Sequence, residues 1–342
     1  MDVSGMPVRD MAVVLVEDSS QVAGARRAAA GLARALGFDE ATSGRVALAV
    51  TEAATNLLKH AGRGEILLGT ARAGGHAVIE ILVLDRGPGM ANVDRCLEDG
   101  YSTAGSAGTG LGALRRVADT FDVYSRPGGT ALLLRVGPSA HAPPAATSAV
   151  LVGGVSVAVA GEEQCGDAWD QEPQAGGLAV LVVDGLGHGA TAAQAARECV
   201  GAFRRHAGAP PAARITALHK ALRATRGAAV AVAEIDAHRR VVRFAGLGNV
   251  AGSVYGGGPV RHLVSHHGTA GHSAHRIAEY TYPWPPHAVL IIHSDGVASL
   301  RDLASYPGLL QRDPGLVAGV LYRDFSRRRD DATVVVARGR VS

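Results

Sequence analysis

The sequence predicts two α+β domains, and three observations carry this prediction: the chain length, a change of pattern between the halves, and a seam between them. A chain of 342 residues suffices for about two domains of ordinary size. From Gly137 to Ala149 the sequence lacks hydrophobic periodicity and is rich in Pro, Ala and Ser, as is typical of linkers. Before this seam helices and strands are mixed, and after it many strands surround two helices. We therefore expect domains over 1–137 and 150–342 and a linker over 138–149.

Hydrophobic periodicity predicts the individual elements. The longest expected helix has Val46, Val50 and Leu57 at helical spacing and Asp39 as a plausible N-cap. In the first half we expect strands over 11–16, 64–70, 76–84, 121–125 and 130–136, helices over 20–36 and 39–61, then a short helix and one from about 110. In the second half we expect helices over 190–206 and 212–224 and a closing strand over 332–337.

Composition excludes several classes of protein. Hydrophobic residues make up 47% and charged residues 19%, and 34 Lys and Arg against 31 Asp and Glu leave a net charge of +3. This balance gives no electrostatic footprint for nucleic acid or an anionic membrane. The three cysteines, Cys96, Cys165 and Cys199, form no CxxC pair, which favours reduced thiols. With no signal core or membrane-spanning apolar run, we expect a cytoplasmic protein that binds neither nucleic acid nor membrane.

Motifs that suit nucleotide binding follow one another in the first half. Glu52 and Asn56 fall on one face of the long helix, since they are four residues apart. Segment 85–89, Asp-Arg-Gly-Pro-Gly, follows an apolar strand, segment 105–112 is a Gly-rich loop that opens a helix, and segment 128–130 is Gly-Gly-Thr. Each motif alone is weak, because such a helix face is usually solvated and most lone Gly-rich loops are turns. The ordered set points to phosphate binding at a helix start.

In this order the motifs resemble the ATP-binding fold shared by DNA gyrase, heat-shock chaperone ATPases and sensor histidine kinases. More narrowly, they resemble the small anti-sigma-factor serine kinases, and segments 98–103 and 108–116 are most similar to the switch kinase of the bacterial stressosome. The resemblance covers 11–136 and implies an N-terminal α/β sandwich of the histidine-kinase-like ATPase type. No histidine precedes Glu52 in a phosphoacceptor-like context, so we do not expect an autophosphorylating histidine kinase.

The resemblance also implies roles for individual residues. Asn56 would hold Mg²⁺ against the triphosphate, Asp85 would bind the adenine amine, and Glu52 would be the general base that orients an incoming serine hydroxyl. Phosphoryl transfer needs mainly positioning and charge neutralisation, so one carboxylate and one metal suffice. The ATP-binding residues implied in this way, base pocket and lid included, are Asn56, Asp85, Gly87, Gly89, Gly108, Gly110, Leu111, Gly112 and Thr130.

Acidic residues at predicted strand ends mark the second half. Asp167 lies in Cys-Gly-Asp-Ala-Trp, Asp184 in Asp-Gly-Leu-Gly-His-Gly after an apolar strand, Asp295 in Ser-Asp-Gly after another, and Asp330 just before the closing strand. A lone Asp-Gly is usually a turn. Carboxylates that converge from several strand ends are what hard divalent cations bind, and unpaired they would be strongly unfavourable in a protein interior.

These motifs, together with Gly-Leu-Gly-Asn at 246–249 and the segment 265–271, resemble the metal-dependent type 2C protein phosphatases, in the branch of stage II sporulation protein E and the sigma regulators. The resemblance runs from about 149 to 338 and implies an α-β-β-α sandwich. It also implies two Mg²⁺ or Mn²⁺ ions that activate a bridging water for in-line attack on phosphorus. No covalent intermediate is then needed.

The same resemblance implies the metal ligands. Asp184 would bridge the two ions and the Gly185 carbonyl would add a ligand, while Asp295 and Asp330 would complete the coordination of the first ion and Asp167 would bind the second ion. Asp330 is expected rather than Asp331, because the family pattern is acid, polar, any residue, Thr.

Two rival features of the second half carry less weight. Arg327, Arg328 and Arg329 could bind phosphate, although a charge run is more often a solvated loop. A histidine-rich stretch could suggest zinc, yet it has no Cys or close acidic partner and its glycines suggest a loop. The histidines are His262, His266, His267, His272 and His275.

Together the halves suggest a partner-switching regulator, a kinase-like ATP-binding domain fused to a phosphatase. By resemblance, its partner would be a small phosphorylatable protein, a STAS-type anti-sigma-factor antagonist, in a sigma-factor or stress pathway. Two alternatives keep the phosphatase but make the first domain an ATP sensor without kinase activity, or a module that sequesters a partner. The presence of Glu52 argues against both.

Overall fold

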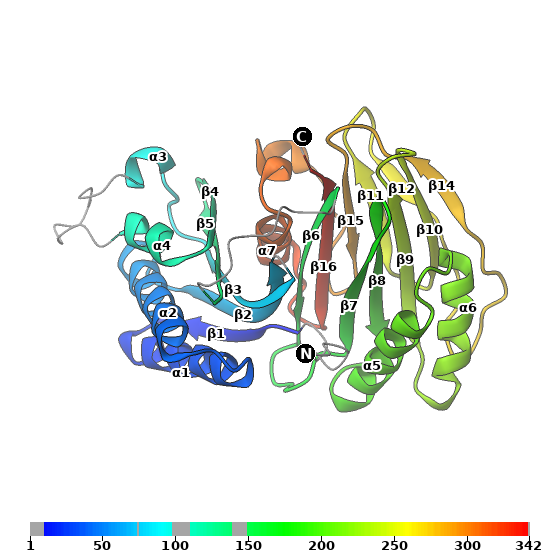
Figure 1. The fold of residues 1–342 in the computed structure, drawn as a ribbon, viewed down its shortest axis with the longest axis horizontal. Coiled ribbons are helices and arrows are strands. Elements are labelled where there is room, and N and C mark those ends of the chain that lie inside the picture. Colours follow the sequence, from blue (N-terminus) through cyan, green and yellow to red (C-terminus); the bar gives the residue numbers. More distant parts are fainter. Residues whose placement is uncertain (1–9, 74, 98–109, 139–148, 341–342) are drawn as a thin grey trace. The chain divides into compact units, whose positions relative to one another are not determined.

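The computed structural model describes residues 10–73, 75–97, 110–138 and 149–340. It divides into two compact units, which Figure 1 shows in sequence colours. The N-terminal unit is built from Met11–Thr147 together with Gln311–Arg323, and the C-terminal unit contains Ser148–Leu310 and Asp324–Ser342. Within the described ranges, no helix has the length and apolar character needed to cross a membrane.

The N-terminal unit is an antiparallel sheet with the strand order β1-β2-β3-β5-β4. Helices α1, α2 and α4 cover one face of it and share its core (Figure 1). The predicted strands and helices are confirmed, with ends that shift by a few residues. The strands are β1 (Ala12–Val16), β2 (Gly64–Ala73), β3 (His76–Asp85), β4 (Thr120–Arg126) and β5 (Gly129–Val136), and the helices are α1 (Ser19–Ala35), α2 (Glu40–Ala61), α3 (Val93–Cys96) and α4 (Leu111–Val117).

Helix α2 forms where local signals and burial agree. The Asp39 side chain caps it by accepting a hydrogen bond from the Thr42 backbone N–H at 2.8 Å. At the other end Gly62 adopts φ 76°, a conformation that favours glycine. Val46, Val50 and Leu57 are among its buried residues. The face that carries them packs on the sheet, and polar side chains can therefore occupy the other, half-buried face of the helix.

The opposite face of the N-terminal sheet is also apolar, and the phosphatase-like part of the sequence covers it. In β3, Ile79, Ile81 and Val83 belong to the core under the helices, whereas the alternate Leu82 and Leu84 are buried outside it. A Cβ at Gly319 would lie 3.1 Å from Leu82 Cδ2 and 3.4 Å from Leu84 Cδ2. A sheet buried on both faces reads as a near-continuous apolar run, as β3 does.

Gly319 lies in helix α7 (Pro314–Phe325), which hydrophobic periodicity did not predict. Every residue from Pro314 to Arg323 is buried, so the helix carries no polar stripe for a 3.6-residue pattern to reveal. The signal that was available is Asp313 followed by Pro314, an N-cap residue and a proline at the first helical position. The Asp313 side chain indeed accepts a hydrogen bond from the Gly315 backbone N–H at 2.8 Å.

A buried arginine anchors the start of this helix segment to the sheet. Arg135 of β5 donates from Nε to Glu80 at 2.6 Å and from Nη1 and Nη2 to the two oxygens of Asp313 at 2.7 and 2.8 Å. Burial lowers the pKa of Arg135, but the two carboxylates outweigh it and raise that pKa. At the other end, Arg323 Nη1 donates to the Asp85 carbonyl at 2.9 Å and the Arg86 guanidinium donates to the Arg323 carbonyl.

We predict that Asp313→Ala lowers the free energy of unfolding of the N-terminal unit by about 3 kcal/mol, because it leaves a buried guanidinium short of an anion and removes a helix cap. Urea denaturation monitored by circular dichroism measures this. The control is Arg312→Ala, which breaks only a 3.3 Å ion pair with Asp122 whose arginine is 46% exposed and should cost less than about 1 kcal/mol. If the two variants unfolded at the same urea concentration, the ion pair between Asp313 and Arg135 would not anchor the helix.

The C-terminal unit consists of two sheets packed face to face, which confirms the predicted two-domain α+β class. The first sheet has the order β13-β10-β9-β8-β7, with β14 beside β10, and the second has the order β12-β11-β15-β16-β6. Residues of both sheets share one core, and helices α5 and α6 cover the outer face of the first (Figure 1). The strands are β6 (Val150–Val157), β7 (Asp167–Gln174), β8 (Gly177–Gly185), β9 (Ala228–Asp236), β10 (Val241–Leu247), β11 (Ala251–Tyr255), β12 (Arg261–Leu263), β13 (Ser265–His266), β14 (Tyr280–Pro283), β15 (Val289–His293) and β16 (Ala332–Gly339), and the helices are α5 (Ala190–Arg205) and α6 (Pro211–Ala221).

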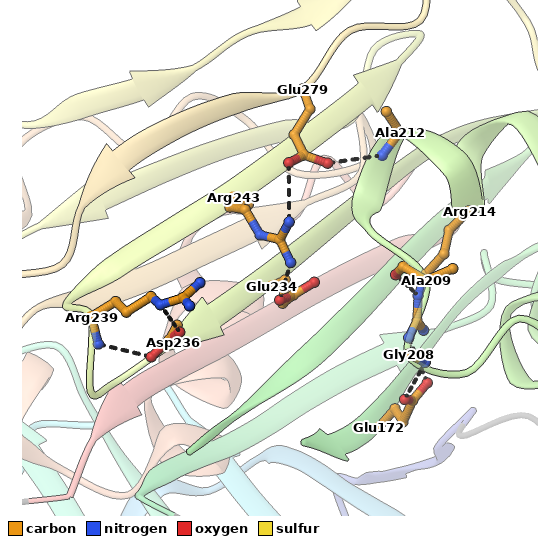
Figure 2. Close-up of polar contacts among 10 residues, drawn as sticks. All are labelled: Glu172, Gly208, Ala209, Ala212, Arg214, Glu234, Asp236, Arg239, Arg243 and Glu279. Atoms are coloured by element: carbon orange, nitrogen blue, oxygen red, sulfur yellow. Dashed lines mark hydrogen bonds and ion pairs between the residues drawn. The ribbon is translucent and has the colours of Figure 1, made fainter. Parts of the chain in front are cut away.

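Polar contacts fix helix α6 against the first sheet (Figure 2). The buried Arg214 pairs with Glu172 of β7 at 2.7 Å, and its guanidinium carbon lies 4.4 Å from the ring centre of Phe203 in α5. At the start of the helix, Glu279 accepts a hydrogen bond from the Ala212 backbone N–H at 3.3 Å. These contacts hold both helices in place behind the strands that end at the acidic residues.

Candidate functional site

Strand register brings the acidic residues of the first sheet together. Asp167 and Asp184 are directly paired across β7 and β8, so their side chains lie on the same face at neighbouring positions. Asp167 is buried and Asp184 half-buried. The Asp184 end of β8 pairs with the start of β9, where Ala229 stands opposite Asp184. The predicted strand-end placement of both residues is therefore correct.

The second sheet supplies the remaining carboxylates at the same end. Beyond β15, the Ser294 N–H donates to the Thr333 carbonyl at 3.0 Å and the Thr333 N–H donates to Ser294 Oγ at 2.9 Å. This pairing places Asp295 beside the start of β16, which begins two residues after Asp330.

The pKa values of two aspartates in this cluster are raised above their ordinary range. Burial, followed by the charges of Asp295, Asp330 and Asp331, raises the pKa of Asp184 to about 7. Burial and then the charge of Asp184 raise the pKa of Asp167 well above its usual range. Oδ2 of Asp184 and Oδ2 of Asp167 are buried, and no described residue hydrogen-bonds to either atom. Orphaned buried carboxylate oxygens are costly unless a cation binds them.

The two adjacent aspartates before β16 differ in what they contact. Asp331 is buried, and its Oδ1 and Oδ2 each accept a backbone N–H at 2.7 Å, from Val159 and Gly166. Asp330 is exposed, and its Oδ1 accepts the Asp331 N–H at 2.9 Å. Asp331 is thus committed to holding loops, and Asp330 is the acid with spare acceptor capacity.

This donor set fits hard divalent cations. It consists of carboxylates with unused buried oxygens, which Mg²⁺ and Mn²⁺ prefer. In the part of the chain that the structure describes, no three His, Cys, Asp or Glu side chains already converge on one point. Each ion would therefore need water ligands as well, which is usual for Mg²⁺.

The histidine-rich stretch has other partners. His262 Nδ1 lies 2.9 Å from Ser253 Oγ, His266 Nε2 lies 3.0 Å from Tyr280 Oη, and His272 Nε2 lies 2.9 Å from the Arg226 carbonyl. These ring nitrogens satisfy ordinary protein hydrogen bonds.

The sequence predicted no role for several residues that lie near the acidic cluster. His188 Nδ1 lies 2.6 Å from Glu162 Oε1, and a Cβ at Gly187 would lie 3.2 Å from Nη1 of the exposed Arg226. Asn249 donates from Nδ2 to Oδ2 of Asp295 at 2.5 Å. His188 and Asn249 stand inside motifs that the sequence displays, whereas Arg226 reaches the Asp184–Gly189 loop only through folding.

In the N-terminal unit, Asp85 is the centre of a hydrogen-bonded pocket at the end of β3. Its Oδ1 accepts the Gly87 N–H at 2.8 Å and the Thr130 N–H at 3.1 Å. Thr130 Oγ1 in turn lies 2.8 Å from Ser125 Oγ. With Oδ1 engaged, the carboxylate is held in one orientation, and Oδ2 is the atom from which a ligand amine would be recognised.

The glycines around this pocket are required by the protein itself. Gly89 adopts φ 76°, and a Cβ there would overlap the Arg126 carbonyl; a Cβ at Gly87 would lie 2.8 Å from the Ala61 Cβ. The resemblance implies that both glycines belong to the base pocket, and close packing of the chain is a second reason for glycine at these positions.

The other predicted nucleotide residues are placed as follows. Glu52 and Asn56 both lie half-buried on helix α2, and Asn56 Nδ2 is buried without a hydrogen-bond partner in the described part of the chain. Gly110 is the residue before α4, while Leu111 and Gly112 begin that helix. Gly108 and the segment 98–103 lie outside the described residues.

Comparison with known proteins agrees with this division. Residues 15–136 match the histidine kinase-like ATPase domain family, and residues 174–340 match the family of stage II sporulation protein E. The chain belongs to the histidine kinase-like ATPase family through its first domain, and its second domain is a type 2C phosphatase domain of the stage II sporulation protein E kind.

One curated protein and two solved structures show more specifically which proteins the two domains are similar to. The chain is 31% identical to serine/threonine-protein kinase RsbT of Bacillus subtilis (strain 168) over 121 residues, which are 35% of this chain and 91% of RsbT. A solved structure described as "The bacterial stressosome: a modular system that has been adapted to control secondary messenger signaling" matches at 26% identity and a TM-score of 0.51, over 55% of this chain and 99% of that one. A crystal structure of RsbX in complex with magnesium shares the fold, at 20% identity and a TM-score of 0.50, over 56% of this chain and 96% of that one.

We predict that Asp184→Asn stabilises the metal-free protein at pH 8 by on the order of 2 kcal/mol. The folded pKa of Asp184, about 7, lies above the ordinary value of 3.8. Its contribution to stability is therefore full below pH 4 and is lost as the pH rises through 7, and a neutral asparagine avoids that loss. Urea denaturation in a chelator at pH 5 and pH 8 measures it.

The matched control for this prediction is Glu163→Gln, which neutralises an exposed acid on a nearby loop and should leave the midpoint unchanged at both pH values. If Asp184→Asn were less stable than the wild type at pH 8, the carboxylate would not be under strain in the metal-free protein.

Proposed function

We propose that this chain is a bifunctional partner-switching regulator. Its C-terminal domain hydrolyses phosphoserine or phosphothreonine on another protein with two Mg²⁺ or Mn²⁺ ions, and its N-terminal domain binds ATP with Mg²⁺ and phosphorylates a protein hydroxyl. One observation carries the phosphatase proposal: Asp167 and Asp184 stand opposite each other across β7 and β8, and the Oδ2 atom of each is buried without a hydrogen-bond partner among the described residues.

In this proposal each acidic residue has one task. Asp184, whose Oδ2 is buried without a hydrogen-bond partner among the described residues, would hold both ions, and the Gly185 carbonyl would add a ligand. Asp295 and Asp330 would complete the coordination of the first ion, and Asp167 would bind the second ion. The bound ions would supply an activated water and neutralise phosphate charge. Arg226 beside the Gly187 loop adds a cation that attracts a phosphate dianion towards the site.

In the N-terminal domain, Asp85 would bind the adenine amine, with Gly87, Gly89 and Thr130 around the base. Asn56, whose side chain has a buried atom without a partner, would hold Mg²⁺. Glu52, one turn before it on the same helix, would orient the acceptor hydroxyl. The relationship to a serine/threonine-protein kinase supports phosphoryl transfer over the alternatives of an ATP sensor or a sequestering module.

The partner that this proposal requires is a small protein with one regulatory serine or threonine. The similarity to RsbT and to a stressosome structure supports a STAS-type anti-sigma-factor antagonist as substrate, in a sigma-factor pathway in the cytoplasm. Kinase and phosphatase acting on the same serine at once would only consume ATP, so we expect different substrates or alternating activities.

We predict that hydrolysis of a phosphoserine protein requires Mn²⁺ or Mg²⁺ and falls at least about 100-fold in Asp184→Ala and in Asp295→Ala, because each loses a metal ligand. Phosphate release with and without chelator measures it. Asp302→Ala, at an exposed turn, is the control. Undiminished hydrolysis by both variants would refute the assigned centre.

We predict that Asn56→Ala abolishes Mg-ATP binding while Glu52→Ala binds ATP normally but no longer transfers phosphate. The first change deletes the metal anchor and the second a group that acts on the acceptor. Calorimetry with a non-hydrolysable ATP analogue reads binding, and labelled ATP with candidate antagonists reads transfer. Binding without transfer in the wild type would favour the ATP-sensor alternative.

A further inference from the structure

Asn249 is placed opposite Asp295 by the register of the second sheet. In the pairing of β11 with β15, Ala251 stands opposite His293. Counting two residues back from Ala251 and two on from His293 brings Asn249 opposite Asp295. The contact between their side chains, 2.5 Å from Nδ2 to Oδ2, is thus a consequence of strand pairing rather than of a chance surface encounter.

The turn that carries Asn249 is fixed by its backbone. Gly248 adopts φ 101°, and a Cβ there would overlap the Cβ of Ala229, the residue opposite Asp184. The Gly248 N–H donates to the His266 carbonyl at 2.8 Å. The asparagine therefore enters the site from a position that cannot shift without disturbing the strand beside Asp184.

The chemistry of the pair determines which way the amide points. A carboxylate accepts hydrogen bonds and cannot donate them when ionised, so the NH₂ group rather than the carbonyl must face Asp295. The Asp295 side chain is thereby held by the Asn249 amide. With Oδ2 committed to the amide, Oδ1 is the oxygen left for a cation.

We propose that Asn249 is a positioning residue, which orients Asp295 for metal binding and offsets the repulsion between the carboxylates of the two sheets. This inference rests on the proposed ligand role of Asp295. Partners that hydrogen-bond to a ligating carboxylate fix its orientation, and their loss typically costs 10–100-fold in metal affinity. Asn249 itself is not a ligand in this arrangement, because its nitrogen faces the acid.

The test is calorimetric titration of the whole chain with MnCl₂, alongside thermal unfolding with and without Mn²⁺. In Asn249→Ala and in the similarly sized Asn249→Leu, we expect about a tenfold weaker Kd for one of two Mn²⁺ ions. The ion held by Asp167, Asp184 and Gly185 should keep its affinity. Asn249→Gln keeps an amide donor and should restore part of the loss.

A merely structural role predicts a different result, namely a lower Tm without metal and an unchanged Kd. Because Asn249 and Asp295 are both exposed, we expect the metal-free Tm to stay within about 2 °C and only the Mn²⁺-induced rise to shrink. Ser265→Ala is the matched control, since Ser265 Oγ donates to the Val250 carbonyl of the same turn at 2.9 Å without touching Asp295.

The outcomes separate this inference from the proposed function. If the wild type binds Mn²⁺ and Asn249→Ala binds both ions equally well, the positioning role is wrong while the metal centre stands. If Ser265→Ala loses as much affinity as Asn249→Ala, the turn rather than the amide matters, and the inference is again wrong. If the wild type binds no Mn²⁺, both proposals fail.

Discussion

Mutual repulsion among carboxylates is the constraint around which the C-terminal domain is built. Folding pairs β7 with β8 and β15 with β16, and these pairings force Asp167, Asp184, Asp295 and Asp330 into one region. Isolated, such a group of charges would be expelled into water or protonated. The apolar core between the two sheets supplies the free energy that holds the cluster together, and divalent cations would convert the repulsion into attraction. The proposed metal centre is thus a strained part of an otherwise apolar sandwich.

The N-terminal domain meets the opposite constraint, an excess of apolar surface. Its strands β3 and β5 are buried on both faces, and only one face of the sheet is covered by the helices α1, α2 and α4. The segment Gln311–Arg323, encoded far downstream, clusters with this unit. Arg135, between Glu80 and Asp313, makes this placement specific, since a buried guanidinium must meet its anions. The domain that binds nucleotide is therefore completed by residues from the phosphatase half of the sequence.

Sequence patterns predicted what depends on local chemistry. Asp39 as a cap, the amphipathic α2 and the strand-end position of Asp184 follow from periodicity and turn residues, and the structure confirms them. Helix α7 was missed because it has no polar face. Asn249 could be seen as part of a motif, but its partner depends on the register of β11 and β15, which no local pattern specifies.

The free oxygens of each aspartate explain why acids of equal appearance have different roles. Asp331 gives both oxygens to backbone N–H groups and is a structural residue. Asp85 gives Oδ1 to two N–H groups, so its position is fixed and one oxygen remains for recognition. Among the described residues Asp184 has a buried Oδ2 without a hydrogen-bond partner, so this oxygen has the capacity to accept a cation. In both domains, the number of unused acceptor sites thus distinguishes an aspartate that holds the backbone from one that could bind a ligand.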